Sequence, residues 1–322
     1  MADKAVIRIL NAEPFGYSNE ARRVLQSVGE LHESALTREG LVAALDGFEA
    51  LIVRLGFRID RRTIDAGCRL RAIVTATTGL DHIDVRYAEE KGVRVLSLKG
   101  EIEFLRSIPA TAEHTWALLL ALTRRIPQAF ASVCRGEWER DAFRGHDLCG
   151  KRLGIVGLGR IGERVARYAM AFGMSVKACD PYRREWVPGV GRADSLHDLL
   201  KDVDVLSLHV PLNDETRHLL GARELEMLPP TSVVVNTSRG AVTDEEALLS
   251  ALGKKQIAGA ALDVIEDENS LRDFADSPLV SYARCHDNLL ITPHLGGATA
   301  ESMSMTEVFM AHKLKSFLES CS

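Results

Sequence analysis

The stretch "RLGIVGLGRIGERVARYAMAFG", residues 152–173, decides the fold of this chain. A short aliphatic run leads into Gly157, Gly159 and Gly162, and a helical pattern of apolar residues follows. The first glycine permits a tight turn, the second lets a pyrophosphate approach the backbone, and the third lets the helix pack on the strand. The amides expected to face the phosphates from the helix N-terminus are those of Arg160 and Ile161.

The residues that follow make this glycine motif more specific than a plain strand-to-helix turn. The next predicted strand, 175–180, ends in Asp180, whose carboxylate can accept hydrogen bonds from an adenosine ribose. The same carboxylate would repel a 2′-phosphate, so NAD is the expected cofactor. Arg183 and Arg184 could offset that repulsion, which leaves NADP as the alternative.

Short β-branched runs alternate with helical stretches along the whole chain, a pattern typical of parallel sheets covered by helices. We therefore expect two α/β domains, each a doubly wound parallel sheet. A capping box of Thr243 and Glu246 is expected to open one helix, and Gly173 to close another. The helix over 112–126 is apolar on nearly every side, which indicates burial at a domain or subunit interface. The predicted strands are 5–10, 50–55, 70–77 and 93–98 in the first half, and 152–157, 175–180, 204–210, 232–238, 258–264 and 289–294 in the second.

Composition narrows the class of protein. At 322 residues with 46% hydrophobic residues, the chain can support two cored domains, and its net charge of −5 offers no basic field for nucleic acid. The apolar run 116–122 is far shorter than the roughly 20 residues that cross a bilayer. Six widely spaced cysteines without a CxxC pair argue against a metal site and a disulfide framework, so we expect a cytoplasmic protein.

Three polar side chains follow three late strands of the second half. Arg239, Asp263 and His294 each come just after an aliphatic run, and ligands of open parallel sheets bind at the carboxyl ends of the strands. A cation that binds the substrate carboxylate, with a histidine as general acid, is what hydride transfer to a 2-oxo acid requires. Taken singly, such an arginine is usually a surface ion pair and such a histidine an incidental polar residue.

Several motifs, in this order, resemble those of the D-isomer-specific 2-hydroxyacid dehydrogenases, the family of phosphoglycerate dehydrogenases and glyoxylate/hydroxypyruvate reductases. The resemblance covers essentially the whole chain. It implies an NAD-dependent oxidoreductase with a Rossmann NAD-binding domain inserted in a flavodoxin-like substrate domain. The motifs are "TTGLDHIDV", "ATAEHTWALLLALTRRIP", "GKRLGIVGLGRIG", "LHVPLNDETRHLL", "VVVNTSRGAVTDEEAL", "GAALDV" and "LLITPHLGGAT".

The resemblance also implies roles for individual residues. It identifies His294 as the acid/base, Glu268 as its carboxylate partner and Arg239 as the substrate anchor. Asp263 is implied to hold the nicotinamide carboxamide. The other implied contacts are Thr77, Thr78 and Gly79 for the substrate carboxylate, Val210 and Pro211 for the adenine, Thr237 and Ser238 for the nicotinamide end, and Thr111 for the cofactor.

The family architecture implies a substrate domain of residues 1–108 plus 297–322 and an NAD-binding domain of residues 109–296. It further implies a homodimer formed through the NAD-binding domain, with a hinge at Gly296 and Gly297. A non-catalytic, NAD-sensing binding protein of the corepressor kind is the rival function. Turnover of a panel of 2-oxo acids would separate the two.

Two departures from the family pattern bear on the site. Asn269 stands where the family usually has proline after its catalytic glutamate, which makes Glu266 a conceivable rival to Glu268. Glu266 and Asp267 are otherwise expected to be solvated turn residues. Arg54 stands where some members bind a distal anionic group, with ion pairing as the alternative, and the long loop 98–108 could contact substrate.

Overall fold

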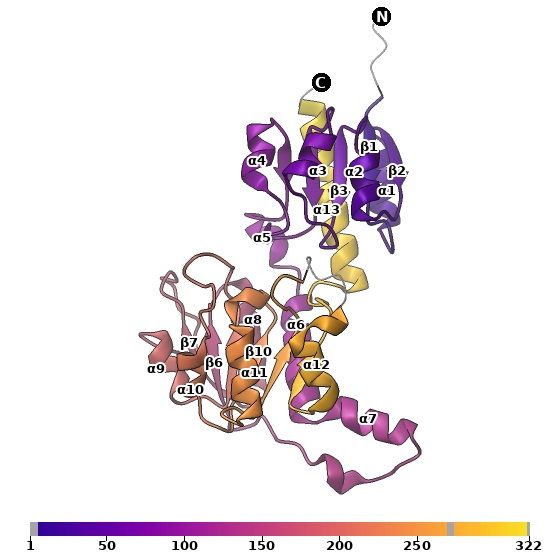
Figure 1. The fold of residues 1–322 in the computed structure, drawn as a ribbon. Helices are drawn as coiled ribbons and strands as arrows, with labels where there is room; N and C mark the ends of the chain where they lie inside the picture. The colour runs from indigo at the N-terminus through magenta and orange to yellow at the C-terminus, as the bar shows by residue number, and fades with distance from the viewer. Residues whose placement is uncertain (1–5, 269–273, 321–322) are drawn as a thin grey trace, which may run out of the picture. The chain divides into compact units, whose positions relative to one another are not determined.

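The computed structural model describes residues 6–268 and 274–320 and divides into two compact units. Unit 1 comprises Met1–Ile108 together with Ala298–Ser322, and unit 2 comprises Pro109–Gly297. Each unit has its own parallel sheet with helices packed against it (Figure 1). The expected class, α/β with two doubly wound sheets, is confirmed.

The sheet of unit 1 has five strands within the described residues, in the order β2-β1-β3-β4-β5. This order is the flavodoxin-like one, in which the chain reverses direction between β1 and β3. The strands are β1 (Arg8–Asn11), β2 (Glu30–Glu33), β3 (Ala50–Val53), β4 (Ala72–Thr75) and β5 (Arg94–Leu96). The helices are α1 (Asn19–Gln26), α2 (Arg38–Ala44), α3 (Arg61–Ala66), α4 (Val85–Glu90), α5 (Ile102–Leu105) and α13 (Ala300–Ser320).

Both faces of this sheet are buried, which explains why its central strands read as unbroken apolar runs. In β3, Ala50 and Ile52 face one core while Leu51 and Val53 face the other. The C-terminal helix α13 completes the first of these cores through Met310, Leu314 and Leu318. Helix α13 is therefore part of the fold of unit 1.

The sheet of unit 2 has seven strands within the described part of the chain, in the order β12-β11-β10-β9-β6-β7-β8. It reverses direction between β6 and β9, as a dinucleotide-binding fold does. The strands are β6 (Arg152–Val156), β7 (Ser175–Cys179), β8 (Val190–Arg192), β9 (Val205–Leu208), β10 (Val233–Asn236), β11 (Gly259–Leu262) and β12 (Leu289–Ile291). The helices are α6 (Ala110–Thr123), α7 (Ile126–Cys134), α8 (Arg160–Ala171), α9 (Leu196–Leu200), α10 (Ala222–Glu226), α11 (Glu245–Gly253) and α12 (Pro278–Cys285).

Two strands, β2 and β8, were not predicted from the sequence. They lie at the edges of their sheets and carry the sequences "ELHE" and "VGR". Edge strands are exposed and need no aliphatic run, so their sequences lack the signal that marks the buried strands.

The predicted capping box at α11 is wrong by one residue. The N-cap is Asp244, whose carboxylate accepts a hydrogen bond from the amide of Ala247 at 3.0 Å. Thr243 is buried, and its hydroxyl accepts a hydrogen bond from the Asn236 side chain at 3.4 Å. Gly173, in contrast, follows α8 at φ +75° as expected for a glycine that ends a helix.

Helix α7 and the segment after it extend away from the rest of unit 2 as an arm, residues 126–147 (Figure 1). The preceding helix α6 buries about half of its residues, Trp116, Leu118 and Leu119 among them. The burial that we expected at an interface is thus provided in part by the core of unit 2 itself.

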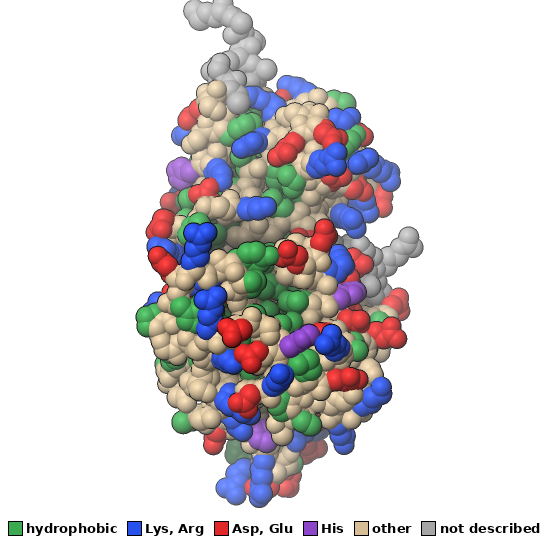
Figure 2. All heavy atoms as spheres, turned by 90° about the vertical axis from the view of Figure 1, so that its left-hand side faces the viewer, with side chains coloured by type: hydrophobic (Ala, Val, Ile, Leu, Met, Phe, Trp, Pro, Cys, Tyr) green, Lys and Arg blue, Asp and Glu red, His purple; other side chains and the backbone are tan. Residues whose placement is uncertain are grey.

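On the face drawn in Figure 2, side chains of both charge signs are interspersed.

The capping geometry of α11 makes a testable distinction. Asp244→Ala should lower the free energy of unfolding by about 1 kcal/mol, because the Ala247 amide loses its partner. The matched change Glu246→Ala, at the exposed residue of the predicted box, should change it by less than about 0.5 kcal/mol. Urea titration followed by circular dichroism measures both, and equal losses would contradict the assignment of the cap.

Candidate active site

The glycine turn after β6 has the shape that a dinucleotide needs. A Cβ on Gly157, which has φ +88°, would lie 2.6 Å from the carbonyl oxygen of His209, and one on Gly162 would lie 2.2 Å from the carbonyl oxygen of Gly157. A Cβ on Gly159 would meet no atom within 4 Å. Since α8 begins at Arg160, the open space at Gly159 lies at a helix N-terminus, where a pyrophosphate fits.

His209 packs against this turn and does not carry a positive charge. Its Nε2 is 2.8 Å from the hydroxyl of Ser207, and burial lowers the pKa of His209 to about 3. The ring is therefore neutral at physiological pH. Val210, the next residue, lies against the turn, since a Cβ on Gly157 would be 2.8 Å from Cγ1 of Val210. The carbonyl of Pro211 accepts a hydrogen bond from the Thr216 hydroxyl at 2.6 Å.

Asp180 at the end of β7 is joined to the glycine turn. Its Oδ2 accepts from the amide of Leu158 at 2.8 Å, and its Oδ1 accepts from the amides of Tyr182 and Arg183 at 3.0 and 3.1 Å. The guanidinium of Arg183 donates to the Leu158 carbonyl and, at 2.9 Å, to Glu163. Arg183 is thus engaged within the turn, whereas the side chain of Arg184 is exposed.

The three late strand ends are neighbours, as expected. Asn236 of β10 pairs in register with Leu262 of β11, and Leu262 pairs with Ile291 of β12. The segments that carry Arg239, Asp263 and His294 therefore leave the sheet side by side. Near these segments, the hydroxyl of Thr237 is 2.8 Å from that of Thr115 on α6. The amide and the hydroxyl of Ser238 both donate to the side-chain oxygen of Asn236. Thr111 lies against Gly296, since a Cβ added to Gly296 would be 3.2 Å from the Thr111 side chain.

His294 and Glu268 form a close pair. Nδ1 of the histidine is 2.5 Å from Oε1 of the glutamate, and each side chain is about one-fifth exposed, at 22% and 21%. His294 has φ 55°, a left-handed conformation that is strained for a side chain of this size. Its amide donates to the carbonyl of Asp263 at 2.8 Å, which helps to hold that conformation.

The carboxylate of Asp263 accepts four hydrogen bonds inside unit 2. Oδ1 accepts from Thr292 and the Leu295 amide at 2.7 Å and lies 3.0 Å from Nε2 of His114, while Oδ2 accepts from the Gly296 amide at 2.7 Å. Burial alone would raise the pKa of Asp263, but these hydrogen bonds outweigh it and hold the pKa below its ordinary value. Asp263 thus fixes the segment that carries His294, and its contact with the nicotinamide stays a prediction.

His114 is a residue that the sequence reasoning missed. It is a histidine on the otherwise apolar helix α6, and it also lies 3.0 Å from the hydroxyl of Thr292. A polar side chain on an apolar helix needs a partner when the helix packs, and that is the signal that would have found it.

Glu266 is neither a solvated turn residue nor a rival for His294. Its carboxylate accepts from Arg217 at 2.8 Å and lies 2.9 Å from Nε2 of His218, both on the segment after β9. Its amide donates to Glu245 at 2.5 Å, and burial together with the charges of Glu266 and Asp267 raises the pKa of Glu245. We call Arg217, His218, Glu245 and Glu266 the acidic-loop clamp.

Two backbone features assist the clamp. A Cβ on Gly240 would lie 2.0 Å from the carbonyl carbon of Ile265, so only glycine allows this loop to pack so closely. Asp267 has φ 52°, and this left-handed turn leads directly into Glu268. Asn269, which stands in place of the usual proline, lies outside the described residues. The clamp and the turn fix Glu268 from its N-terminal side.

The remaining predicted residues belong to unit 1. The hydroxyl of Thr77 donates to the carbonyl of Gly79 at 2.8 Å, and Thr78 is exposed. Arg54 is engaged by Glu307, a partner that the sequence did not indicate. Three charged residues of the 98–108 loop also pair within unit 1, Glu101 with Lys313 and Glu103 with Arg106.

Comparison with known proteins fits this geometry. Residues 116–296 match the model of the D-isomer specific 2-hydroxyacid dehydrogenase NAD binding domain. The chain belongs to the D-isomer-specific 2-hydroxyacid dehydrogenase family. Members of this family are NAD-dependent dehydrogenases and reductases, so the enzyme class and the nicotinamide cofactor expected from the sequence are confirmed.

Individual relatives cover most of the chain. A D-3-phosphoglycerate dehydrogenase of Methanocaldococcus jannaschii is 38% identical over 317 residues, 97% of this chain and 58% of the relative, so the chain spans little more than half of that protein. A hydroxypyruvate reductase of Thermotoga maritima is 37% identical over 92% of this chain and 94% of the relative. The structure of a D-lactate dehydrogenase from Aquifex aeolicus, complexed with NAD and lactic acid, superposes with a TM-score of 0.82 at 28% identity, covering 97% of this chain and 96% of that one.

The acidic-loop clamp predicts an effect of residues that need not touch substrate. Glu266→Ala should lower kcat for 2-oxo acid reduction about tenfold while KM for NADH stays near the wild-type value, because Glu268 loses its fixed position. Arg217→Ala should give a similar loss, and the double variant little more, since the two side chains act as one pair. Steady-state kinetics measure this, with Glu246→Ala as the surface control, and additive losses would contradict the clamp.

Proposed function

We propose that this enzyme interconverts 2-oxo acids and D-2-hydroxy acids with NAD as cofactor, and that His294 and Glu268 are its acid/base pair. The 2.5 Å contact between these side chains carries the proposal. A histidine whose Nδ1 is bound to a carboxylate presents Nε2, in a fixed tautomer, to a substrate oxygen. The position of the pair at strand ends, on the same edge of the sheet as the glycine turn, supports this role.

The reaction assigns each residue a separate task. When bound, the nicotinamide supplies or accepts the hydride at C2 of the substrate. His294 gives a proton to the substrate oxygen in the reduction and takes it back in the oxidation. Glu268 orients the ring and offsets the positive charge of the protonated form.

Arg239 is proposed to bind the substrate carboxylate. It follows β10 at the strand end next to Asp263, and its backbone is fixed because the Asn236 side chain donates to its carbonyl at 2.9 Å. A guanidinium can bind a carboxylate with two parallel hydrogen bonds, which a lysine cannot reproduce. Thr77, Thr78 and Gly79 of unit 1 are proposed as substrate-binding residues.

We propose NAD rather than NADP as the cofactor because of the residues at the carboxyl end of β7. Asp180 keeps a carboxylate where the ribose hydroxyls of adenosine would lie. Arg183, one of the two cations that could have compensated a 2′-phosphate, is held by Leu158 and Glu163. The wide spacing of the cysteines supports a cytoplasmic setting, and no helix within residues 6–268 and 274–320 is long and apolar enough to span a membrane.

A homodimer is proposed through the arm of unit 2. Ile126, Phe130 and Val133 recur at the spacing of one helix face and are 52%, 70% and 49% exposed, and Trp138 beyond them is 85% exposed. A run of large apolar side chains this exposed marks a protein interface. A second copy of the chain is the partner that the family resemblance implies.

Substitutions at the pair test the function. His294→Ala should lower kcat for 2-oxo acid reduction by a factor of about 100 to 10,000, and Glu268→Gln should lower it less, because the amide still accepts a hydrogen bond from the ring. Binding of NADH, followed by its fluorescence, should stay near the wild-type value in both variants. Loss of NADH binding, or unchanged turnover, would contradict the assigned roles.

The wild-type enzyme also separates the proposal from its rival, a non-catalytic NAD-sensing protein. We expect turnover of at least one 2-oxo acid in a panel with NADH, containing glyoxylate, hydroxypyruvate, pyruvate and longer members. NADH binding without turnover of any of them would favour the sensing protein instead.

The proposed dimer is tested on the arm. Phe130→Asp with Val133→Asp should convert the dimer into a monomer, because two carboxylates would be buried without partners. The control is Phe15→Asp, the same substitution at a 92% exposed residue of unit 1, which should leave the mass unchanged. Analytical ultracentrifugation reads the mass, and a wild-type monomer would refute the dimer.

A further inference from the structure

Arg54 stands beside the loop proposed to receive the substrate carboxylate. In unit 1, Val53 at the end of β3 pairs in register with Thr75 at the end of β4. The segments that begin with Arg54 and with Ala76 therefore leave the same edge of the sheet as neighbours. A substrate held by its carboxylate at residues 77–79 would have Arg54 among the nearest side chains to its far end, and a free guanidinium there would bind a phosphate well.

The guanidinium of Arg54 is already bound to a buried carboxylate. Nη2 forms an ion pair with Oε1 of Glu307 on α13, and Nη1 donates to the carbonyl of Phe15 at 2.9 Å. The other oxygen of Glu307 accepts from the amide of Ser18, the N-cap of α1, at 2.6 Å. Glu307 is only 2% exposed, so both of its oxygens have fixed partners away from water.

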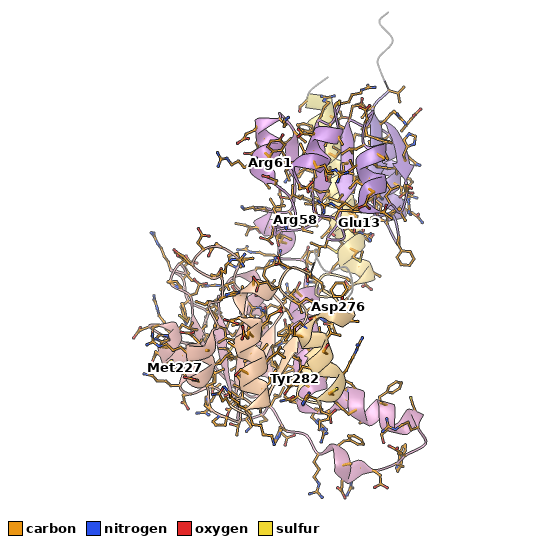
Figure 3. All side chains as sticks on the ribbon, viewed as in Figure 1. Glu13, Arg58, Arg61, Met227, Asp276 and Tyr282 are labelled. Atoms are coloured by element: carbon orange, nitrogen blue, oxygen red, sulfur yellow. The ribbon has the colours of Figure 1, made fainter. Side chains whose placement is uncertain are left out.

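A second carboxylate lies at the same strand end. Oε2 of Glu13 accepts from the amide of Arg54 at 2.5 Å, and its Oε1 accepts from the amide of Gly56 at 3.0 Å. Figure 3 shows Glu13 at the same edge of unit 1 as Arg58. Glu307 thus binds the guanidinium of Arg54, while Glu13 binds backbone amides at the same strand end.

The ring of Tyr17 packs beside Arg54 and helps to close its surroundings to water. Tyr17 is buried, and the guanidinium carbon of Arg54 lies 5.7 Å from the centre of its ring. Burial, and then the charge of Glu307, raises the pKa of the Tyr17 phenol. Tyr17 therefore stays neutral and adds no charge of its own.

We propose that Glu307 determines substrate specificity: by neutralising Arg54, it restricts the enzyme to 2-oxo acids whose far end is uncharged. This inference rests on the proposed function. A phosphorylated substrate would have to displace the buried carboxylate of Glu307 from Arg54, or approach a guanidinium whose charge Glu307 already neutralises, and both are unfavourable. Specificity of this kind works through repulsion of the wrong substrate.

Two substrates that differ only in a phosphate test the inference in the wild-type enzyme. Hydroxypyruvate should be reduced with a kcat/KM at least about tenfold higher than that of 3-phosphohydroxypyruvate, with NADH at pH 7. Equal or higher kcat/KM for the phosphorylated substrate overturns the inference and leaves the proposed function intact. Failure to reduce either of these or any other 2-oxo acid refutes the proposed function, and the inference with it.

Glu307→Gln identifies the residue responsible. Glutamine keeps the shape and removes the negative charge, and its one carbonyl oxygen can accept from Ser18 or from Arg54 but not from both. The ratio of the two kcat/KM values should move at least about tenfold toward the phosphorylated substrate, and adding Arg54→Met should cancel that gain. Arg58→Met, the loss of an exposed arginine at the same edge, should leave the ratio unchanged.

Glyoxylate provides an internal control, because it has no far end that could reach Arg54. Its kcat/KM should change less than about threefold in Glu307→Gln, which separates specificity from a general loss of structure. An unchanged substrate ratio in a folded Glu307→Gln variant overturns the inference. If that variant does not fold, the wild-type comparison alone decides.

Discussion

The rest of the candidate site depends on one buried carboxylate, that of Asp263. Donors from α6 and from the segment after β12 converge on it at 2.7 to 3.0 Å, and its side chain is 1% exposed. A buried carboxylate without such donors would be severely destabilising. The donors include the amides of Leu295 and Gly296, the two residues that follow His294. The hydrogen bonds to Asp263 therefore also fix the backbone that carries the histidine.

Glu268, the other member of the pair, is fixed by different parts of the chain. Its loop is held by Glu245 at the start of α11 and by Arg217 from the segment after β9, and it packs on Gly240 without space for a side chain. The histidine and the glutamate therefore arrive from two separately anchored segments. A contact of 2.5 Å between them requires both anchors, which is the preorganisation that acid/base chemistry needs.

The sequence predicted what local patterns encode. The glycine turn, the buried strands and the order of the strand ends follow from spacing and hydrophobicity, which require no knowledge of distant residues. Polar pairs between distant residues could not be found in this way. His114 and Asp263 are separated by 149 positions, and Arg54 and Glu307 by 253, so only the folded chain reveals that they are partners. The edge strands β2 and β8 were missed because exposure removes the apolar signal.

Those edge strands have a consequence for the protein in concentrated solution. An exposed strand edge offers unpaired backbone groups to another chain. β2 carries Glu30 and Glu33, and Glu33 is held in an ion pair with Arg22, while β8 is only three residues long and carries Arg192. A neighbouring molecule that paired with either edge would have to bury these charges. The features that concealed these strands in the sequence therefore protect these two edges against pairing with another molecule.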